Sequence, residues 1–189
     1  MKINKYNKLL DKSLFMSQIF IGSSVSLTDP SHFSNVKGYR KSLFSLINPK
    51  LFHYSLKTAF LFLESVVKNK FKLIFVLKID DPILFTKFSY VCSKKNHLIF
   101  KDTDISAGFL NNSDLVNSIF ITLFLDQKKI NLIQKETFFK GVPLISFGDL
   151  STNKNSNSIY VGGNFDSFLA KNLILTLLIN CILKKNDNS

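Results

Sequence analysis

Residues 73–77 read Leu-Ile-Phe-Val-Leu, and this stretch indicates the fold class more clearly than any other. It is a continuous apolar run, which is typical of a strand that is covered on both faces in a parallel sheet. Asp81 and Pro82 follow it, and they favour a helix start, because Asp can cap a helix and Pro suits its first turn. The pattern predicts a strand at 73–77 and a helix from Pro82 to about Ser93.

Similar strand-helix units occur on both sides of this stretch. Asn48-Pro49 and Asp126 supply further helix starts, and Gly141 with Pro143 supplies a helix end. Residues 151–158 are too polar to pack and predict a loop, after which 159–161 suit a brief extended segment. Further strands are expected at 43–47, 97–101, 119–125 and 144–147, and further helices at about 50–68, 127–140 and 165–183.

This alternation predicts an α/β fold with a five-stranded parallel sheet flanked by helices, in the three-layer arrangement of flavodoxin-like and Rossmann-like proteins. A chain of 189 residues suits one domain with a substantial core. We place that domain at residues 43–184. An N-terminal extension with a basic loop segment precedes it at 1–42, and a polar tail follows at 185–189.

The composition favours a negatively charged partner. The formal net charge is +12, from 25 basic and 13 acidic residues, so the surface should attract a nucleic acid or an acidic lipid surface. Arg40 is the only arginine, Trp is absent, and Lys, Asn, Ile and Phe are abundant. These abundant residues have A/T-rich codons, which indicates an organellar or otherwise A/T-biased genome.

Neither the cysteines nor the apolar C-terminal segment indicates a special environment. Cys92 and Cys181 lie too far apart in the sequence for a disulfide framework or a paired metal site, and we expect buried thiols. The best candidate for a membrane segment, Leu173 to Leu183, is shorter than the roughly 20 apolar residues that span a bilayer. We expect a buried helix there and no membrane insertion, with a small membrane-associated protein as an alternative.

Four carboxylates lie near the carboxyl ends of the expected strands, where ligands bind in open parallel sheets. These residues are Asp80, Asp81, Asp126 and Asp149. They suit a magnesium ion or a phosphoacceptor, so a flavodoxin-like receiver or a magnesium-dependent enzyme is the alternative function. Two of them already have a role as helix caps, and no nucleotide-binding glycine motif is present. We therefore expect a non-enzymatic protein without catalytic residues, metal, cofactor or small-molecule substrate.

A basic segment gives the stronger functional signal. Lys37, Arg40 and Lys41 surround Tyr39 in a glycine-containing stretch without periodicity. Cations next to an exposed aromatic ring suit phosphate contacts combined with base stacking. An ordinary solvated charge cluster explains the same residues equally well. His32, His53 and His97 are scattered, and we expect a polar or packing role for each of them.

A series of short elements also occurs in order along the chain. It comprises Gly22, Asp29-Pro30, Gly38-Tyr39-Arg40, Ala107 to Asn112, Ser113-Asp114-Leu115, Gly141-Val142-Pro143, Asp149, and Gly163 to Asp166. Over about residues 9–184, this series resembles the G-H, N-P, G-x-R, G-G-M-L-T-N, P-D, G-I-P, D-T-N and P-G-N-D-D elements of the small-subunit ribosomal protein S-two family. Ser23 stands where that family has His, and Ser31 and Phe33 replace basic residues.

The resemblance implies a parallel-sheet scaffold that binds small-subunit ribosomal RNA and neighbouring ribosomal proteins. It also implies that the helical hairpin which bacterial relatives insert before the fourth strand is lacking, since few residues separate Asn112 from Ile119. This loss and the A/T-biased composition favour a mitochondrial ribosome over a plastid one. The residues that we expect to contact RNA are Lys37, Arg40, Lys41, Lys50, Asn111, Asn112 and Lys154.

Overall fold

The computed structural model describes residues 12–40, 43–112, 118–153 and 158–183. Residues 12–16 are helical. The strands are β1 (Val36–Arg40), β2 (Phe44–Ile47), β3 (Lys72–Leu77), β4 (Leu98–Lys101), β5 (Ser118–Leu123), β6 (Leu144–Gly148) and β7 (Ser158–Gly162). The α-helices are α2 (Pro49–Lys68), α3 (Pro82–Lys94), α4 (Gln127–Lys140) and α5 (Phe168–Leu183). Short 3-10 helices are η1 (Val25–Leu27), η2 (Pro30–Asn35), η3 (Asp102–Asp104) and η4 (Phe109–Asn112).

Five strands form one parallel sheet in the order β4-β3-β5-β6-β7. Counted along the chain this order is 2-1-3-4-5, which is the flavodoxin-like order with its switch point between β3 and β5. The central strands are apolar because both of their faces are covered: every residue of β5 and of β6 is buried. The predicted α/β class with a five-stranded parallel sheet is confirmed.

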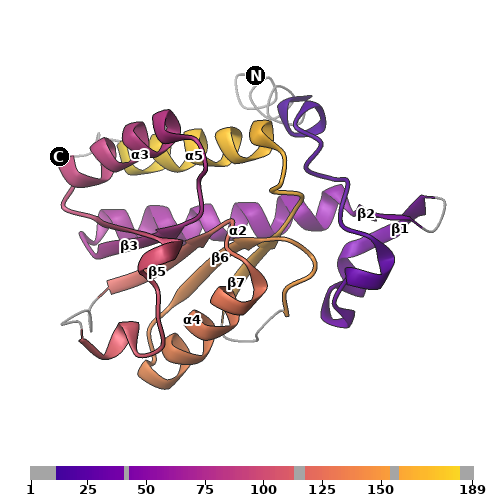
Figure 1. Cartoon of the computed structure of the whole chain (residues 1–189). Helices are drawn as coiled ribbons and strands as arrows, with labels where there is room; N and C mark the ends of the chain where they lie inside the picture. Colours follow the sequence, from indigo (N-terminus) through magenta and orange to yellow (C-terminus); the bar gives the residue numbers. More distant parts are fainter. Residues whose placement is uncertain (1–11, 41–42, 113–117, 154–157, 184–189) are drawn as a thin grey trace.

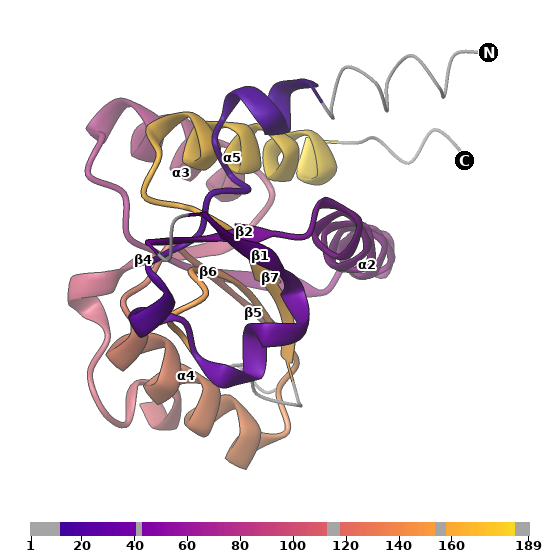
Figure 2. The same cartoon turned by 90° about the vertical axis from the view of Figure 1, so that its right-hand side faces the viewer.

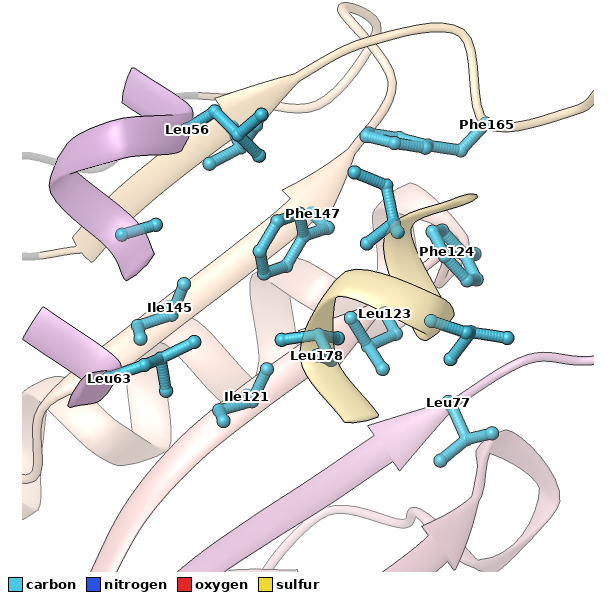
Figure 3. Packing of buried hydrophobic residues seen from close by; sticks show 14 of the residues in the cluster. Leu56, Leu63, Leu77, Ile121, Leu123, Phe124, Ile145, Phe147, Phe165 and Leu178 are labelled. Atoms are coloured by element: carbon cyan, nitrogen blue, oxygen red, sulfur yellow. The ribbon is translucent and has the colours of Figure 1, made fainter. Parts of the chain in front are cut away.

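Three helices cover one face of the sheet and one helix covers the other. Figures 1 and 2 show α2, α3 and α5 on one side and α4 on the opposite side. Alternate strand residues point to opposite faces, so Phe75, Ile121 and Phe147 pack against the three-helix side, whereas Ile74 and Phe120 pack on the α4 side. Figure 3 shows side chains of α2 and α5 lying against β5 and β6.

One predicted strand belongs to a different layer. Residues 43–47 were expected as the first strand of the parallel sheet, but β2 pairs antiparallel with β1 in a separate two-stranded sheet. Burial alternates along β2: Ser45 and Ile47 are buried, while Phe44 and Leu46 are exposed. This pattern is that of a strand covered on one face only, whereas a central strand of a parallel sheet is covered on both. The fifth parallel strand is instead β7, which was expected only as a brief extended segment.

The helix boundaries follow the predicted caps with one exception. The side chains of Asn48 and Asp81 accept hydrogen bonds from backbone amides in the first turns of α2 and α3. Gly141 ends α4 in the left-handed conformation, with a φ of 65°. Asp126 occupies the cap position of α4, but its side chain makes no capping hydrogen bond. Its carboxylate accepts instead from Lys78 Nζ, at 2.9 Å.

The last helix begins at Phe168, three residues later than expected. Phe165 is buried before the helix, with its ring centroid 5.2 Å from that of Phe124 and 6.4 Å from that of Phe147. Among the helices of the described residues, none combines the length and the apolar character needed to span a bilayer.

The N-terminal segment packs on the α/β core. Leu14, Ile19 and Phe20 are buried in the main apolar cluster, which also contains residues of α2, α5 and the sheet. The Asn164 amide donates to the Ile19 carbonyl at 2.9 Å, so this packing is also held by backbone hydrogen bonds. The domain boundary expected between residues 42 and 43 lies in the connection from β1 to β2.

Candidate nucleic-acid interface

Three extended segments form a small antiparallel layer beside the main sheet, here called the hairpin layer: residues 20–23, 36–40 and 44–47. Across β1 and β2, Arg40 lies opposite Phe44 and Gly38 lies opposite Leu46. On the other edge of β2, Ile21 bridges to Leu46, and the Gly22 amide donates to the Ser45 carbonyl at 2.8 Å. In Figure 1 the two labelled strands extend away from the parallel sheet, beside the start of α2.

The predicted cations Lys37 and Arg40 are both exposed on β1. Neither forms an ion pair with another residue of the described segments. The three-residue separation along a strand places their backbones about 10 Å apart. A register shift between Val36 and Gly38 marks a β-bulge, and a bulge changes the direction of the side chain that it carries, which here is Lys37.

A third predicted cation, Lys50, lies at the base of the same hairpin. It is exposed in the first turn of α2, and its backbone amide donates to the Asn48 side chain at 3.1 Å. The Asn48 amide donates to the Asn35 carbonyl at 2.8 Å, two residues before Lys37. Lys37, Arg40 and Lys50 therefore belong to one region of the surface.

The hairpin layer also exposes several apolar side chains. Residues opposite each other in an antiparallel pair point to the same face, so Arg40, Phe44, Leu46 and Ile21 share one face. The exposed fractions are 50% for Phe44, 41% for Ile21 and 38% for Leu46. Tyr39, which was expected to stack beside the cations, lies opposite the buried Ser45 and thus on the other face.

A buried polar contact fixes the position of the hairpin layer. His32 of η2 is fully buried, and its Nε2 lies 2.7 Å from the Thr152 carbonyl oxygen. A carbonyl only accepts, so Nε2 carries the proton, and Nδ1 accepts from the Asn35 side-chain amide at 3.3 Å. The His32 ring also lies 4.9 Å from the Tyr160 ring. This contact confirms the polar packing role expected for His32.

Tyr160 and Asp149 extend the same contact into the main sheet. The Tyr160 hydroxyl donates to the Asp149 carbonyl at 2.5 Å and shares a hydrogen bond with the Thr152 hydroxyl. Burial raises the pKa of Tyr160, which favours the protonated phenol that donates this hydrogen bond. These hydrogen bonds hold the loop after β6 in the conformation in which Thr152 contacts His32 of η2.

The predicted contacts at Asn111 and Asn112 lie in another part of the molecule. Both residues belong to η4, and the preceding backbone is fixed by α4: Glu136 accepts from the Gly108 and Leu110 amides at 2.6 and 3.0 Å. Figure 1 shows this segment, after β4, on the opposite side from β1 and β2. The structure does not bring these asparagines together with the hairpin cations. Lys41 and Lys154 lie outside the described residues.

The carboxylates at the strand ends line a second site, here called the strand-end cleft, with a volume of about 380 Å³. Its lining includes Asp80, Asp126, Asp149 and Asp166 together with Lys78 and Lys171. Lys78 pairs with Asp126 at 2.9 Å, and this hydrogen bond raises the pKa of Lys78. Lys171 pairs with Asp80 at 3.8 Å. Burial raises the pKa of Asp149.

This pairing does not produce the metal site that the alternative function requires. Asp81 is used as the cap of α3 and does not line the cleft. Within the described part of the chain, no group of three or more His, Cys, Asp or Glu residues is arranged to hold a metal ion. The predicted carboxylates Asp80, Asp81, Asp126 and Asp149 are therefore not gathered into such a group.

The two sites differ in the charge that they present. Lysines of the strand-end cleft are paired with carboxylates, whereas the hairpin layer presents cations beside exposed apolar side chains. The latter arrangement suits a polyanion that also has flat apolar surfaces, as nucleic acid does. Comparison of the sequence with models of known protein families gives no match, and a search among curated proteins finds no significantly similar relative.

Proposed function

We propose that this chain is a structural constituent of the small subunit of a mitochondrial ribosome, similar to the S-two family, and that it binds ribosomal RNA through the hairpin layer. One observation carries the proposal: Lys37 and Arg40 are exposed on a strand apart from the main sheet, and no described carboxylate pairs with them. The net charge of +12 extends this preference for a polyanion to the whole chain.

Two further features support the assignment to this family and compartment. The strand order is that of the open α/β scaffold implied by the ordered elements, from Gly22 to Asp166. Only residues 113–117 separate η4 from β5, which is too short for the inserted helical hairpin of bacterial relatives. A shortened protein with A/T-biased composition suits a mitochondrial ribosome.

The proposed role requires no chemistry by the protein. Arg40 can bind a phosphate with two parallel hydrogen bonds, and the lysines contribute as point charges. Phosphate contacts supply most of the affinity, while the shape of the folded RNA and neighbouring ribosomal proteins set the position. Asn111 and Asn112 of η4, together with Lys154, are then secondary contacts.

The test compares two variants with the same change in net charge. The first replaces Lys37, Arg40 and Lys41 with Gln. The control replaces Lys87, Lys94 and Lys95, of which the first two are exposed on α3 and the third caps its end. RNA binding is measured by filter retention over a range of salt concentrations. We expect the slope of log affinity against log salt to decrease by about two to three in the hairpin variant, because each lost phosphate contact removes about 0.7–0.9.

The same variants are then followed in gradients with mitochondrial small subunits. We expect the hairpin variant to lose association and the control to sediment with the subunit. An unchanged salt slope and unchanged association in the hairpin variant would refute the assignment. Equal losses in both variants would show that net charge alone drives binding, which also contradicts a role for the hairpin layer.

A further inference from the structure

Gly38 is the one glycine for which the fold provides no reason. A Cβ atom at Gly22, Gly148, Gly162 or Gly163 would come within 3.0 Å of another side chain. Gly108 and Gly141 have left-handed backbones, with φ values of 85° and 65°. At Gly38 the φ is not positive, and an added Cβ would meet nothing within 4 Å. All seven glycines lie in the described residues, so this comparison is complete.

The β-bulge at this position does not require glycine either. The bulge type that needs glycine holds it in the left-handed conformation, which Gly38 does not adopt. Glycine weakens a strand, because it loses more conformational freedom on folding than other residues and packs no side chain. Glycine in a strand is also found where a ligand approaches the backbone closely, and the space above Gly38 is open.

The residues around this open space are of the types that bind a nucleobase. Leu46 lies directly opposite Gly38, and Phe44 and Arg40 form the next pair on the same face. Phe44 is half exposed, and Leu46 and Ile21 extend the apolar surface beside it. Exposed apolar side chains with an arginine on the same face suit a planar base attached to a phosphate.

We propose that an unpaired RNA base stacks on Phe44 above Gly38, with Arg40 binding the adjacent phosphate. This inference rests on the proposed function and specifies its RNA as a single-stranded loop, bulge or end. A base paired in an A-form duplex keeps its faces stacked on its neighbours, so only an unpaired base can lie flat on this surface. The cations of β1 favour RNA over an uncharged protein segment as the occupant.

The absence of Trp from the chain allows a direct optical test. Phe44→Trp creates a protein with one Trp in the proposed site. Tyr90→Trp is the matched control, because Tyr90 is 60% exposed on α3 and has Lys94 Nζ 4.4 Å from its ring centroid. We expect a single-stranded oligouridylate or oligoadenylate to quench the fluorescence of Phe44→Trp. The same RNA should leave Tyr90→Trp unchanged, and a duplex of equal length should quench Phe44→Trp much less.

Gly38→Val tests the open space itself. Valine suits a strand, and its Cβ meets no atom of the protein, so circular dichroism and thermal unfolding should match the wild type. We expect its affinity for single-stranded RNA to fall roughly tenfold, as for loss of one stacked base. Phe44→Tyr should retain the affinity, whereas Phe44→Leu, which keeps the apolar contact but lacks the ring, should lose it.

The outcomes separate this inference from the function on which it rests. If the wild type binds RNA with a salt slope that depends on Lys37 and Arg40, but Phe44→Trp is not quenched and Gly38→Val binds normally, the stacking site is overturned and the function stands. If polyglutamate quenches Phe44→Trp as strongly as RNA does, the site recognises charge and not bases, and the inference fails. If the wild type binds neither single-stranded nor duplex RNA, the proposed function fails as well.

Discussion

The hairpin layer and the parallel sheet contain the same types of apolar residue, but the sheet buries side chains that the hairpin layer leaves exposed. Phe147 of β6 is fully buried, with its ring 6.5 Å from that of Phe60 and 6.4 Å from that of Phe165. Phe44 of β2 is half exposed, while its neighbour Ser45 is buried. A strand covered on both faces contributes to the scaffold, and a strand covered on one face leaves apolar side chains available for a partner.

The cations show the same contrast. Lys78 and Lys171 in the strand-end cleft are paired with Asp126 and Asp80, so their charges are largely compensated within the molecule. Lys37 and Arg40 have no such pairing among the described residues, and their field extends outward. Both regions contain two cations, but only the cleft also contains carboxylates, so the two regions differ in what they can attract.

The largest expected effect compares the two phenylalanines. Phe147→Ala should decrease the free energy of unfolding by about 3–5 kcal/mol, because it removes buried contacts and leaves a cavity. Phe44→Ala should change it by less than about 1 kcal/mol, because half of the ring already contacts water. Urea denaturation followed by circular dichroism measures both values. A loss of several kcal/mol in Phe44→Ala would show that the hairpin layer belongs to the core.

The same contrast explains how far the sequence alone predicts the fold. The continuous run at 73–77 and the Asn48, Asp81 and Gly141 signals are local, and the structure has the corresponding elements. Residues 43–47 are also apolar and β-favouring, but the face that stays exposed depends on pairing with β1 and Ile21. Pairing between distant strands is not encoded in one segment. The predicted parallel sheet therefore included residues 43–47 as its first strand and did not include β7.

The candidate site was predictable to a similar degree. Lys37 and Arg40 were selected from local polarity and Lys50 from the family resemblance; all three are exposed, and their contact with RNA stays a prediction. Phe44 was missed, since only the register that sets it opposite Arg40 places it on an open face. The contact from His32 to Thr152 spans 120 residues, so no local pattern could indicate it.

The second expected effect concerns this buried contact between the two regions. His32→Ala leaves the Thr152 carbonyl without its donor and removes the ring beside Tyr160. We expect the free energy of unfolding to fall by about 1–3 kcal/mol, the range for a buried polar group that loses its partner. Phe33→Ala is the control, because Phe33 is the next residue and is 51% exposed. It should change stability by no more than about 0.5 kcal/mol.

RNA binding by His32→Ala tests whether the buried contact also positions the cations of the hairpin layer. The variant keeps every cation of the hairpin layer, so its salt slope should match the wild type at temperatures where the sheet is folded. Its affinity should nevertheless decrease, since η2 no longer fixes the position of β1. Wild-type affinity together with lowered stability would mean that other contacts hold β1 in position without His32, such as the Asp29 amide, which donates to the Leu150 carbonyl at 2.9 Å.

The smallest expected effect is a difference in pH dependence between two aspartates. Burial raises the pKa of Asp149 in the strand-end cleft, so its ionised form destabilises the folded protein. Hydrogen bonds from the Ser31 side chain and amide lower the pKa of Asp29, at the start of η2, so its ionised form is stabilising. Thermal unfolding of Asp149→Asn and Asp29→Asn between about pH 3 and pH 7 should therefore give changes of opposite sign.

The signs follow from proton binding in the folded and unfolded states. Asp149→Asn should be more stable than the wild type at neutral pH, and this gain should shrink as the pH falls through the raised pKa of Asp149 and be absent below the ordinary aspartate pKa of about 4. Asp29→Asn should be less stable at neutral pH, with a deficit that shrinks only as the pH falls through the lowered pKa of Asp29. If Asp149→Asn were less stable than the wild type at pH 7, the hydrogen bonds that the Asp149 carboxylate accepts, such as that from the Leu150 amide at 2.8 Å, would outweigh the cost of its burial.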